Sequence, residues 1–302
     1  MPEVSPGRIL TLVAPSLKDP RIMNSAAVTL WVILGQSVYY FNRDPIDILA
    51  AMGTACLLDF ALMLVILRQV AVPLSAYLTG ISIVILVESN DWRIYVVAAI
   101  WGILSKYLIR DGRRHFFNPS NFAIVMILLF SHGTASVAPG SQWGADYRIA
   151  FIIMFLGLLM MYRINRLDLA FSWLGGYVFM GLLRMALGQG GLVFALGPMT
   201  GAEFALFTFV MMPDPKASPP TRRGRIAWGI SIAIVDGILR YMEIRYSMFY
   251  ALFIHTAMLP IMHWAAARTG LEEGDPWRMI QWTLSRCAPR AEPVQSPAPV
   301  DR

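Results

Sequence analysis

Runs of apolar residues, separated by short polar segments, follow one another along most of the chain. A helix that crosses a membrane needs about 20 mostly apolar residues, and about 17 are enough. The pattern predicts ten such helices, at residues 24–41, 47–67, 73–88, 92–109, 118–131, 147–162, 167–187, 200–212, 225–243 and 247–267. The fifth and eighth runs are short, which is typical of helices that begin or end inside the membrane, where irregular backbone lines a protein cavity.

The fold class that this pattern predicts is all-α: a polytopic membrane protein of about ten transmembrane helices. We expect a cytoplasmic N-terminal segment at residues 1–23, a transmembrane domain at 24–267 and a cytoplasmic tail at 268–302. The end of the tail is rich in proline and poor in apolar residues, which predicts disorder there.

The composition supports a membrane protein and excludes other classes. Of the 302 residues, 57% are hydrophobic and 15% are charged, against about 45–50% and about 25% in a typical soluble domain. That much apolar surface cannot be hidden in a water-soluble core, so membrane lipid is the expected surrounding. The net charge of +6 does not indicate a nucleic-acid partner, because the basic residues lie between the apolar runs and not in one stripe with aromatic residues.

The distribution of the basic residues predicts the orientation of the chain. With ten crossings, 19 of the 25 lysines and arginines fall on the side that holds both termini. Because basic residues are enriched in cytoplasmic loops, both termini are expected to be cytoplasmic.

A short internal similarity indicates a repeat. The segment Gly102–Arg110 resembles Gly237–Arg245, with Gly, Ile, Leu, Ile and Arg at matching places 135 residues apart. The two segments end the fourth and ninth runs, so a repeat displaced by five crossings would run in opposite directions through the membrane. That predicts two inverted five-helix repeats, an architecture common in transporters, unless the match arose by chance among apolar residues.

The first motif that carries chemical information is Arg113–Phe122, at the cytoplasmic start of the fifth run. Proline is well tolerated at a first helical position, and an asparagine before it can cap free backbone N–H groups, so Asn118-Pro119 is at least a capped helix start. The functional interpretation is an amide and a helix N-terminus that face a polar or anionic ligand, with Arg113 and Arg114 nearby.

The second motif is Met211–Arg225, which leaves the eighth run on the same cytoplasmic side. Its four prolines exclude a helix there. A simple basic loop would explain the prolines and arginines, but less well the position of Asp214 between two prolines at the membrane exit. Both motifs lie beside a short run on one face of the membrane, so we expect them to converge on a site.

Together these motifs resemble the RnfD/NqrB family of membrane subunits in ion-pumping, flavin-carrying electron-transfer complexes. His-Phe-Phe-Asn-Pro before an apolar run is one part of the likeness. The other is Thr208-Phe209 and Met211, then Asp214-Pro215, Ser218-Pro219, Thr221 and Gly224-Arg225. The similarity covers roughly residues 25–265 with both motifs in order, and Asn-Pro-Ser-Asn also resembles the branch associated with enediyne biosynthesis.

The resemblance implies a flavin site, with other redox subunits of a complex as partners, in a bacterial cytoplasmic (inner) membrane. In the family the helix with the Asn-Pro motif contributes to the flavin site, so Asn118 is carried over, with Asp214 and Thr221 near the same cavity. Phe117 would belong to an aromatic bed for the ring system, and Arg114 to its basic rim. The flavin would be riboflavin or FMN, bound noncovalently, and a quinone is the alternative cofactor.

The sequence departs from the family in the external loop after the fifth run. Members that bind FMN covalently use the threonine of a Ser-Gly-Ala-Thr motif there. Here the loop Ser131–Val137 is shorter and lacks the motif, so Thr134 is the one candidate for a covalent link.

Two acids fall inside apolar runs, Asp59 in the second and Asp236 in the ninth. A charge at that depth costs a few kcal/mol, about 2.5–3.5 at the helix centre, so these acids are candidates for an ion pathway. Each could equally be held by neighbouring polar groups. The four histidines give no convincing pair on two helices, so haem is not expected, and no metal site is predicted.

The function that we expect is that of a membrane electron-transport subunit that uses a flavin or a quinone, with the protein setting the cofactor's orientation and potential. It would thus be a subunit of a membrane oxidoreductase, with possible coupling to ion movement. The alternatives are a transporter or channel for a small solute, and a non-redox scaffold that keeps the fold.

Overall fold

The computed structural model describes residues 11–13, 20–38, 43–111, 114–137, 147–214 and 217–269. Nearly all regular structure in this part of the chain is helical. The helices are α1 (Pro20–Val38), α2 (Pro45–Leu62) with the π-helix η1 (Met63–Leu67), α3 (Leu74–Leu86), α4 (Trp92–Leu108), α5 (Pro119–Phe130), α6 (Tyr147–Arg163), α7 (Leu167–Ala186), α8 (Leu192–Leu196) with the 3₁₀ helix η3 (Gly197–Thr200), α9 (Ala202–Leu206) with the π-helix η4 (Phe207–Met211), α10 (Arg222–Tyr241) and α11 (Ser247–Thr269).

Three short pairs of strands join loops at the ends of the helices. The strands are β1 (Thr11–Val13), β2 (Gln69–Ala71), β3 (Val87–Glu88), β4 (Arg110–Asp111), β5 (Arg114–His115) and β6 (Ser136–Val137). The pair β1–β2 is parallel, whereas β3–β6 and β4–β5 are antiparallel.

The prediction of a mainly helical fold is confirmed, since each of the ten apolar runs overlaps helix in the described residues. The eighth run differs in form. It begins earlier, at Leu192, and the axes of Leu192–Thr200 and Glu203–Met211 differ by 65°. In the described residues, Pro45–Leu67 and Leu167–Ala186 are long and apolar enough to cross a membrane, and the bent pair makes a third if it counts as one span. The ten crossings therefore stay a prediction.

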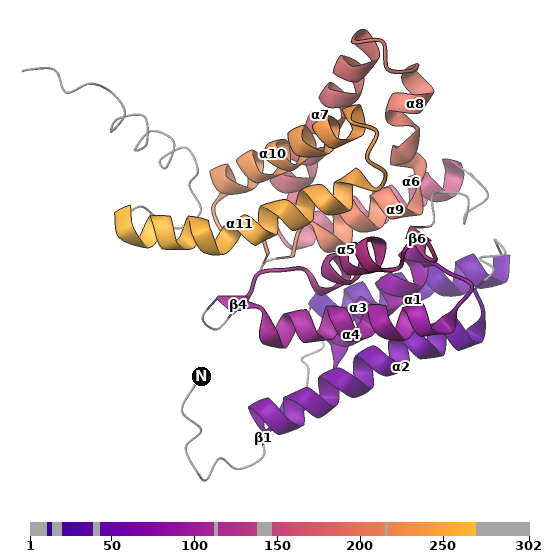
Figure 1. Cartoon of the computed structure of the whole chain (residues 1–302), viewed down its shortest axis with the longest axis vertical. Coiled ribbons are helices and arrows are strands. Elements are labelled where there is room, and N and C mark those ends of the chain that lie inside the picture. The colour runs from indigo at the N-terminus through magenta and orange to yellow at the C-terminus, as the bar shows by residue number, and fades with distance from the viewer. Residues whose placement is uncertain are drawn as a thin grey trace, which may run out of the picture.

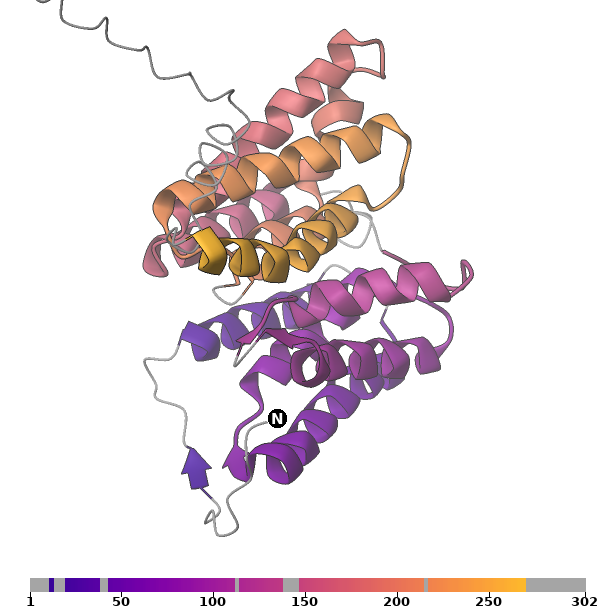
Figure 2. The ribbon, with the colours of Figure 1, turned by 60° about the vertical axis from the view of Figure 1, so that its left-hand side comes forward.

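The helices form two halves that lie one above the other (Figures 1 and 2). In the first half α2 packs against α3 and α4, and α4 against α5; in the second α7 packs against α8 and α10, and α10 against α11. The halves meet along α5 and α11 and along α3 and α9. This matching order of contacts is what two repeats would produce. The glycines of the sequence match, however, face different neighbours: Gly102 faces Thr79 and Pro119, whereas Gly237 faces Met180.

Three of the short helices, α3, α5 and η4, are largely buried. In α3, every residue from Thr79 to Leu86 is buried, and η4 and most of α5 are also buried. The longer helices α2, α6 and α7 surround them and expose large apolar side chains, such as Leu57 (73% exposed), Phe151 (73%) and Phe179 (64%). A water-soluble monomer rarely exposes so much apolar surface, whereas helices that face lipid do. A short apolar helix enclosed by others can end inside a membrane because protein, not lipid, surrounds its free backbone groups.

The loops gather at two opposite ends of the helices. We call one of them the basic end; it consists of the described parts of loops 68–73, 109–118, 164–166 and 212–221. We call the other the far end; it consists of the described parts of loops 87–91, 131–137, 187–191 and 242–246. In Figure 1, β4 and the C-terminal end of α11 lie on the left, and β6 and α8 on the right. Strand pairs β1–β2 and β4–β5 join segments at the basic end, and β3–β6 joins segments at the far end. These contacts agree with the predicted alternation of helix directions.

Close packing of α7 on α10 depends on a glycine. A Cβ atom on Gly229 would clash with Ser172 Oγ and lie 2.9 Å from Trp173 N and 3.0 Å from Leu169 O, and backbone atoms cannot move aside alone. Small residues that let helices approach in this way are typical of membrane proteins.

Gly229→Ala is therefore expected to lower stability by about 1–3 kcal/mol through overpacking. Gly53→Ala is the matched control, because a Cβ on Gly53 of α2 would meet nothing within 4 Å. The measurement is the temperature at which the detergent-purified protein stops migrating as one species in size-exclusion chromatography. Equal midpoints for the two variants would contradict the packing argument.

Candidate functional site

Asn118 has two roles at the start of α5. Its Oδ1 accepts hydrogen bonds from the backbone N–H groups of Ser120 and Asn121, both at 3.1 Å, while Pro119 occupies the first helical position. The capped helix start is thus confirmed. Asn118 Nδ2 points the other way and donates to Asp214 Oδ2 at 3.4 Å, across 96 residues of chain. The two motifs of the sequence are therefore in contact, as predicted.

The loop that carries Asp214 is closed by its own hydrogen bonds. The carbonyl oxygen of Asp214 accepts from Ala217 N at 3.0 Å and from Ser218 Oγ at 2.8 Å. A third segment, the turn between α6 and α7, joins here, because Arg166 Nη1 donates to Ser218 Oγ at 2.6 Å and to Pro219 O at 3.5 Å. We call this group of Asn118, Asp214, Arg166 and Ser218 the junction.

Arg166 is partly buried and lies near a second arginine. Burial of the Arg166 guanidinium, together with the charge of nearby Arg225, lowers the pKa of Arg166 below its ordinary value. An arginine keeps its proton even so.

An ion pair fixes the end of the loop onto α7. Arg225 Nε lies 3.0 Å from both carboxylate oxygens of Asp168, and Arg225 Nη2 lies 2.6 Å from Asp168 Oδ2. Arg225 Nη1 also donates to Pro220 O at 2.7 Å. Thr221 Oγ1 caps α10 by accepting from Gly224 N at 3.1 Å. The predicted site residue Thr221 therefore sets where the helix begins.

Phe117 lies in a cluster of phenylalanine rings between α5 and α11. Its ring stacks on Phe253 at a centroid distance of 4.8 Å and meets Phe122 edge-on at 5.0 Å. The ring of Phe116 is tilted against it at 4.8 Å. The aromatic bed predicted for a flavin is, in this structure, a closed cluster that joins the two halves.

Asn121, which we did not predict as a site residue, is the most informative polar group near the junction. It is 1% exposed, and its Nδ2 donates to Phe249 O at 3.2 Å. Its Oδ1 is buried and accepts no hydrogen bond from any described residue. A buried acceptor without a donor is costly, so this atom indicates a missing donor, from a ligand or a water molecule. Its spacing of three residues from Asn118, on the same side of a helix, could have pointed to it.

The two acids inside the helices are neutralised by bases. Asp59 Oδ1 accepts from Lys106 Nζ at 2.7 Å and from Tyr107 Oη at 2.8 Å.

Asp236 pairs with Arg240 Nε at 2.8 Å and accepts from Ser247 Oγ at 2.5 Å. Asp59 lies in the first half towards the basic end, and Asp236 in the second half towards the far end. The structure does not bring the two acids together.

The remaining predicted site residues lie in two different places. Thr134 is exposed at the far end, where its Oγ1 donates to Ser131 O at 2.7 Å and its carbonyl oxygen accepts from Ser89 Oγ at 3.0 Å. Thr134 is therefore at the opposite end from Asn118. Arg114 lies in β5, opposite Asp111, in the segment that leads to α5. Within the described ranges, no group of three or more His, Cys, Asp or Glu could hold a metal ion.

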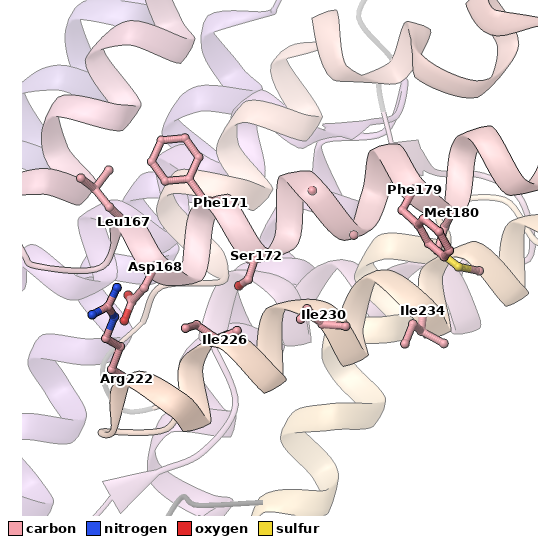
Figure 3. A pocket seen from close by; sticks show the side chains of 12 residues that line it. Leu167, Asp168, Phe171, Ser172, Phe179, Met180, Arg222, Ile226, Ile230 and Ile234 are labelled. Carbon is pink, nitrogen blue, oxygen red and sulfur yellow. The ribbon is translucent and has the colours of Figure 1, made fainter. Parts of the chain in front are cut away.

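A groove of about 740 Å³ runs between α7 and α10 (Figure 3). One end is polar, with Asp168, Ser172 and Arg222, and the rest is apolar. The groove does not include Asn118 or Asp214, but it includes Asp168, whose ion pair with Arg225 holds the loop beside the junction.

We compared the chain with models of protein families and with curated proteins, and neither comparison gave a match.

The Asp168–Arg225 pair gives a prediction for the stability of the basic end. Asp168→Asn or Arg225→Gln alone is expected to cost about 3–5 kcal/mol, because each leaves a largely buried charge without its partner. The double variant is expected to cost less than the two single costs added together. A double-mutant cycle on thermal midpoints measures this, and additive costs would contradict a direct interaction.

Proposed function

We propose that the chain is a ten-crossing membrane subunit of the RnfD/NqrB kind, with both termini in the cytoplasm. In this proposal it carries a noncovalent flavin within a multi-subunit electron-transfer complex of a bacterial cytoplasmic membrane. The observation that supports it best is the contact between Asn118 and Asp214, which joins the two motifs that carry the resemblance.

The polar groups around the junction suit a flavin. A flavin ring carries an N–H donor beside carbonyl acceptors, and Asn121 Oδ1 is a buried acceptor that needs a donor. A quinone ring offers only acceptors, so it would leave this atom unsatisfied. The N-terminus of α5 would favour a negative charge on a reduced flavin or on a phosphate group.

The roles of the chain's own residues follow from these contacts. Asn118 and Asp214 would hold the loops around the cofactor, and Asn121 would orient its polar edge. The cluster around Phe117 would keep water from one side. The flavin, when bound, would supply the electron transfer itself. Because Thr134 lies at the far end, the proposal uses no covalent link there.

In this proposal the two buried acids have a structural role and do not form an ion pathway. Asp59 and Asp236 each have a basic partner in hydrogen-bonding distance, so each would have to exchange that partner before it could pass an ion. A small-solute transporter or channel and a non-redox scaffold are the alternative functions, and the flavin content of the purified protein separates them from the proposal.

The purified full-length protein is expected to show flavin absorbance at about one equivalent. Asn118→Leu and Asn121→Leu should each lower the flavin content, because each removes an amide that would contact or orient the ring. The measurement is flavin absorbance and fluorescence per mole of folded protein.

The matched control is Asp44→Leu. Asp44 also caps a helix that begins with proline, since its Oδ1 accepts from Ile46 N at 2.9 Å at the start of α2, but it lies at the far end. The Asp44→Leu variant should lose a helix cap and keep the flavin. A colourless wild-type preparation, or flavin content that falls equally in all three variants, would overturn the proposal.

The proposed orientation has its own test. In a background with Cys56→Ser and Cys287→Ser, we expect Thr134→Cys to react with a membrane-impermeant thiol reagent added outside intact cells. Arg68→Cys, in the loop before α3, should react only after the membrane is opened. Reaction of both residues from outside would contradict the assignment of the basic end to the cytoplasm.

A further inference from the structure

The groove between α7 and α10 exists because of two glycines with different neighbours. A Cβ atom on Gly176 would lie 2.7 Å from Ala233 Cβ, so Gly176 lets α10 come close. A Cβ on Gly175 would meet nothing within 4 Å, so Gly175 leaves an open floor. Phe171 and Phe179 rise on one side of this floor, and the isoleucines of α10 line the other (Figure 3).

The polar end of the groove has an excess of positive charge. The first turn of α10 carries three positive charges, those of Arg222, Arg223 and Arg225, whereas Asp168 supplies one negative charge. Arg225 is engaged with Asp168. Arg222, which lines the groove, and Arg223 are exposed and form no ion pair with a described residue. This end therefore carries a net charge of +2.

The length of the groove matches one leaflet of a bilayer. Its lining on α10 extends from Arg222 to Ile234, which is about 18 Å at a rise of about 1.5 Å per residue. Half of a hydrocarbon core that is about 30 Å thick is about 15 Å. A ligand that fills the groove would have a negatively charged head at the basic end and an apolar tail that reaches the middle of the membrane.

We propose that this groove binds one anionic phospholipid of the cytoplasmic leaflet. Its phosphate would lie at Arg222 and Arg223, and one acyl chain would lie over Gly175. Charge complementarity decides the occupant, because a neutral quinone would bring no negative charge to the two arginines. A zwitterionic lipid would bring its own positive group together with its phosphate, so its head group would have no net charge to offset theirs. The inference rests on the membrane orientation in the proposed function but not on the flavin.

The test uses the full-length protein in detergent and native mass spectrometry to measure lipid binding. Phosphatidylglycerol, phosphatidylcholine, a short-chain benzoquinone and inorganic phosphate are the probes. We expect phosphatidylglycerol to bind more tightly than phosphatidylcholine. Arg222→Gln and Arg223→Gln should each weaken phosphatidylglycerol binding about five-fold, the change expected when one basic side chain is removed near an anionic membrane surface.

Two control variants make the test specific. Arg68→Gln removes an exposed arginine from the same end of the molecule but outside the groove, and it should leave the lipid preference unchanged. Gly175→Leu fills the floor and should lower the amount of phosphatidylglycerol that is retained. Gly53→Leu adds the same side chain at another open helical position and should not.

Several results would overturn the inference. They are equal binding of the two lipids, equal effects of Arg222→Gln and Arg68→Gln, saturation by inorganic phosphate alone, and displacement of the lipid by the quinone. Flavin absorbance is read from the same samples. A colourless protein that keeps the lipid preference would overturn the flavin proposal and leave this inference standing, whereas a flavin-bound protein without the preference would do the reverse.

Discussion

The amide of Asn118 is the group on which the arrangement of the basic end depends. Its oxygen satisfies the first N–H groups of α5, a helix buried between the two halves, and its nitrogen reaches the carboxylate of Asp214. A helix start with free donors is costly away from water. The same side chain therefore allows α5 to begin among other helices and ties the second half of the chain to that starting point.

Once α5 can begin there, the central elements can be short. Helices α3, α5 and α9 with η4 are enclosed by longer helices whose apolar side chains face outward. The two kinds of helix therefore differ in role. The peripheral helices α2 and α7 are long and apolar enough to cross a membrane, and the enclosed helices supply ends and loops that hold polar groups. The two π-helices, η1 and η4, both end at the basic end, and such distortions are frequent at functional sites.

Much of this was predictable from the sequence, for a physical reason. Helix positions follow from apolar run length, and the cap at Asn118 follows from local chemistry, because an asparagine needs only its own next residues to act as a cap. The helical segment Leu192–Thr200 before the bend was missed, because glycines and a proline interrupt the apolar pattern there. Asn121 and the bond from Arg166 to Ser218 were also missed, because both depend on which helix lies beside which. The distribution of the basic residues, which predicts the orientation, gave no sign of which arginines form ion pairs.

The pairing of the arginines connects the two proposed binding regions. Arg166 reaches into the loop of Asp214, and Arg225 holds the end of that loop on Asp168, which forms the polar end of the groove on its other side. One carboxylate thus separates the junction from the lipid-facing surface. A negative head group beside Arg222 would offset repulsion among the arginines of α10, and that would favour the ion pair that keeps the loop near Asn118. Occupancy of the proposed lipid site would in this way be linked to order at the junction through Asp168.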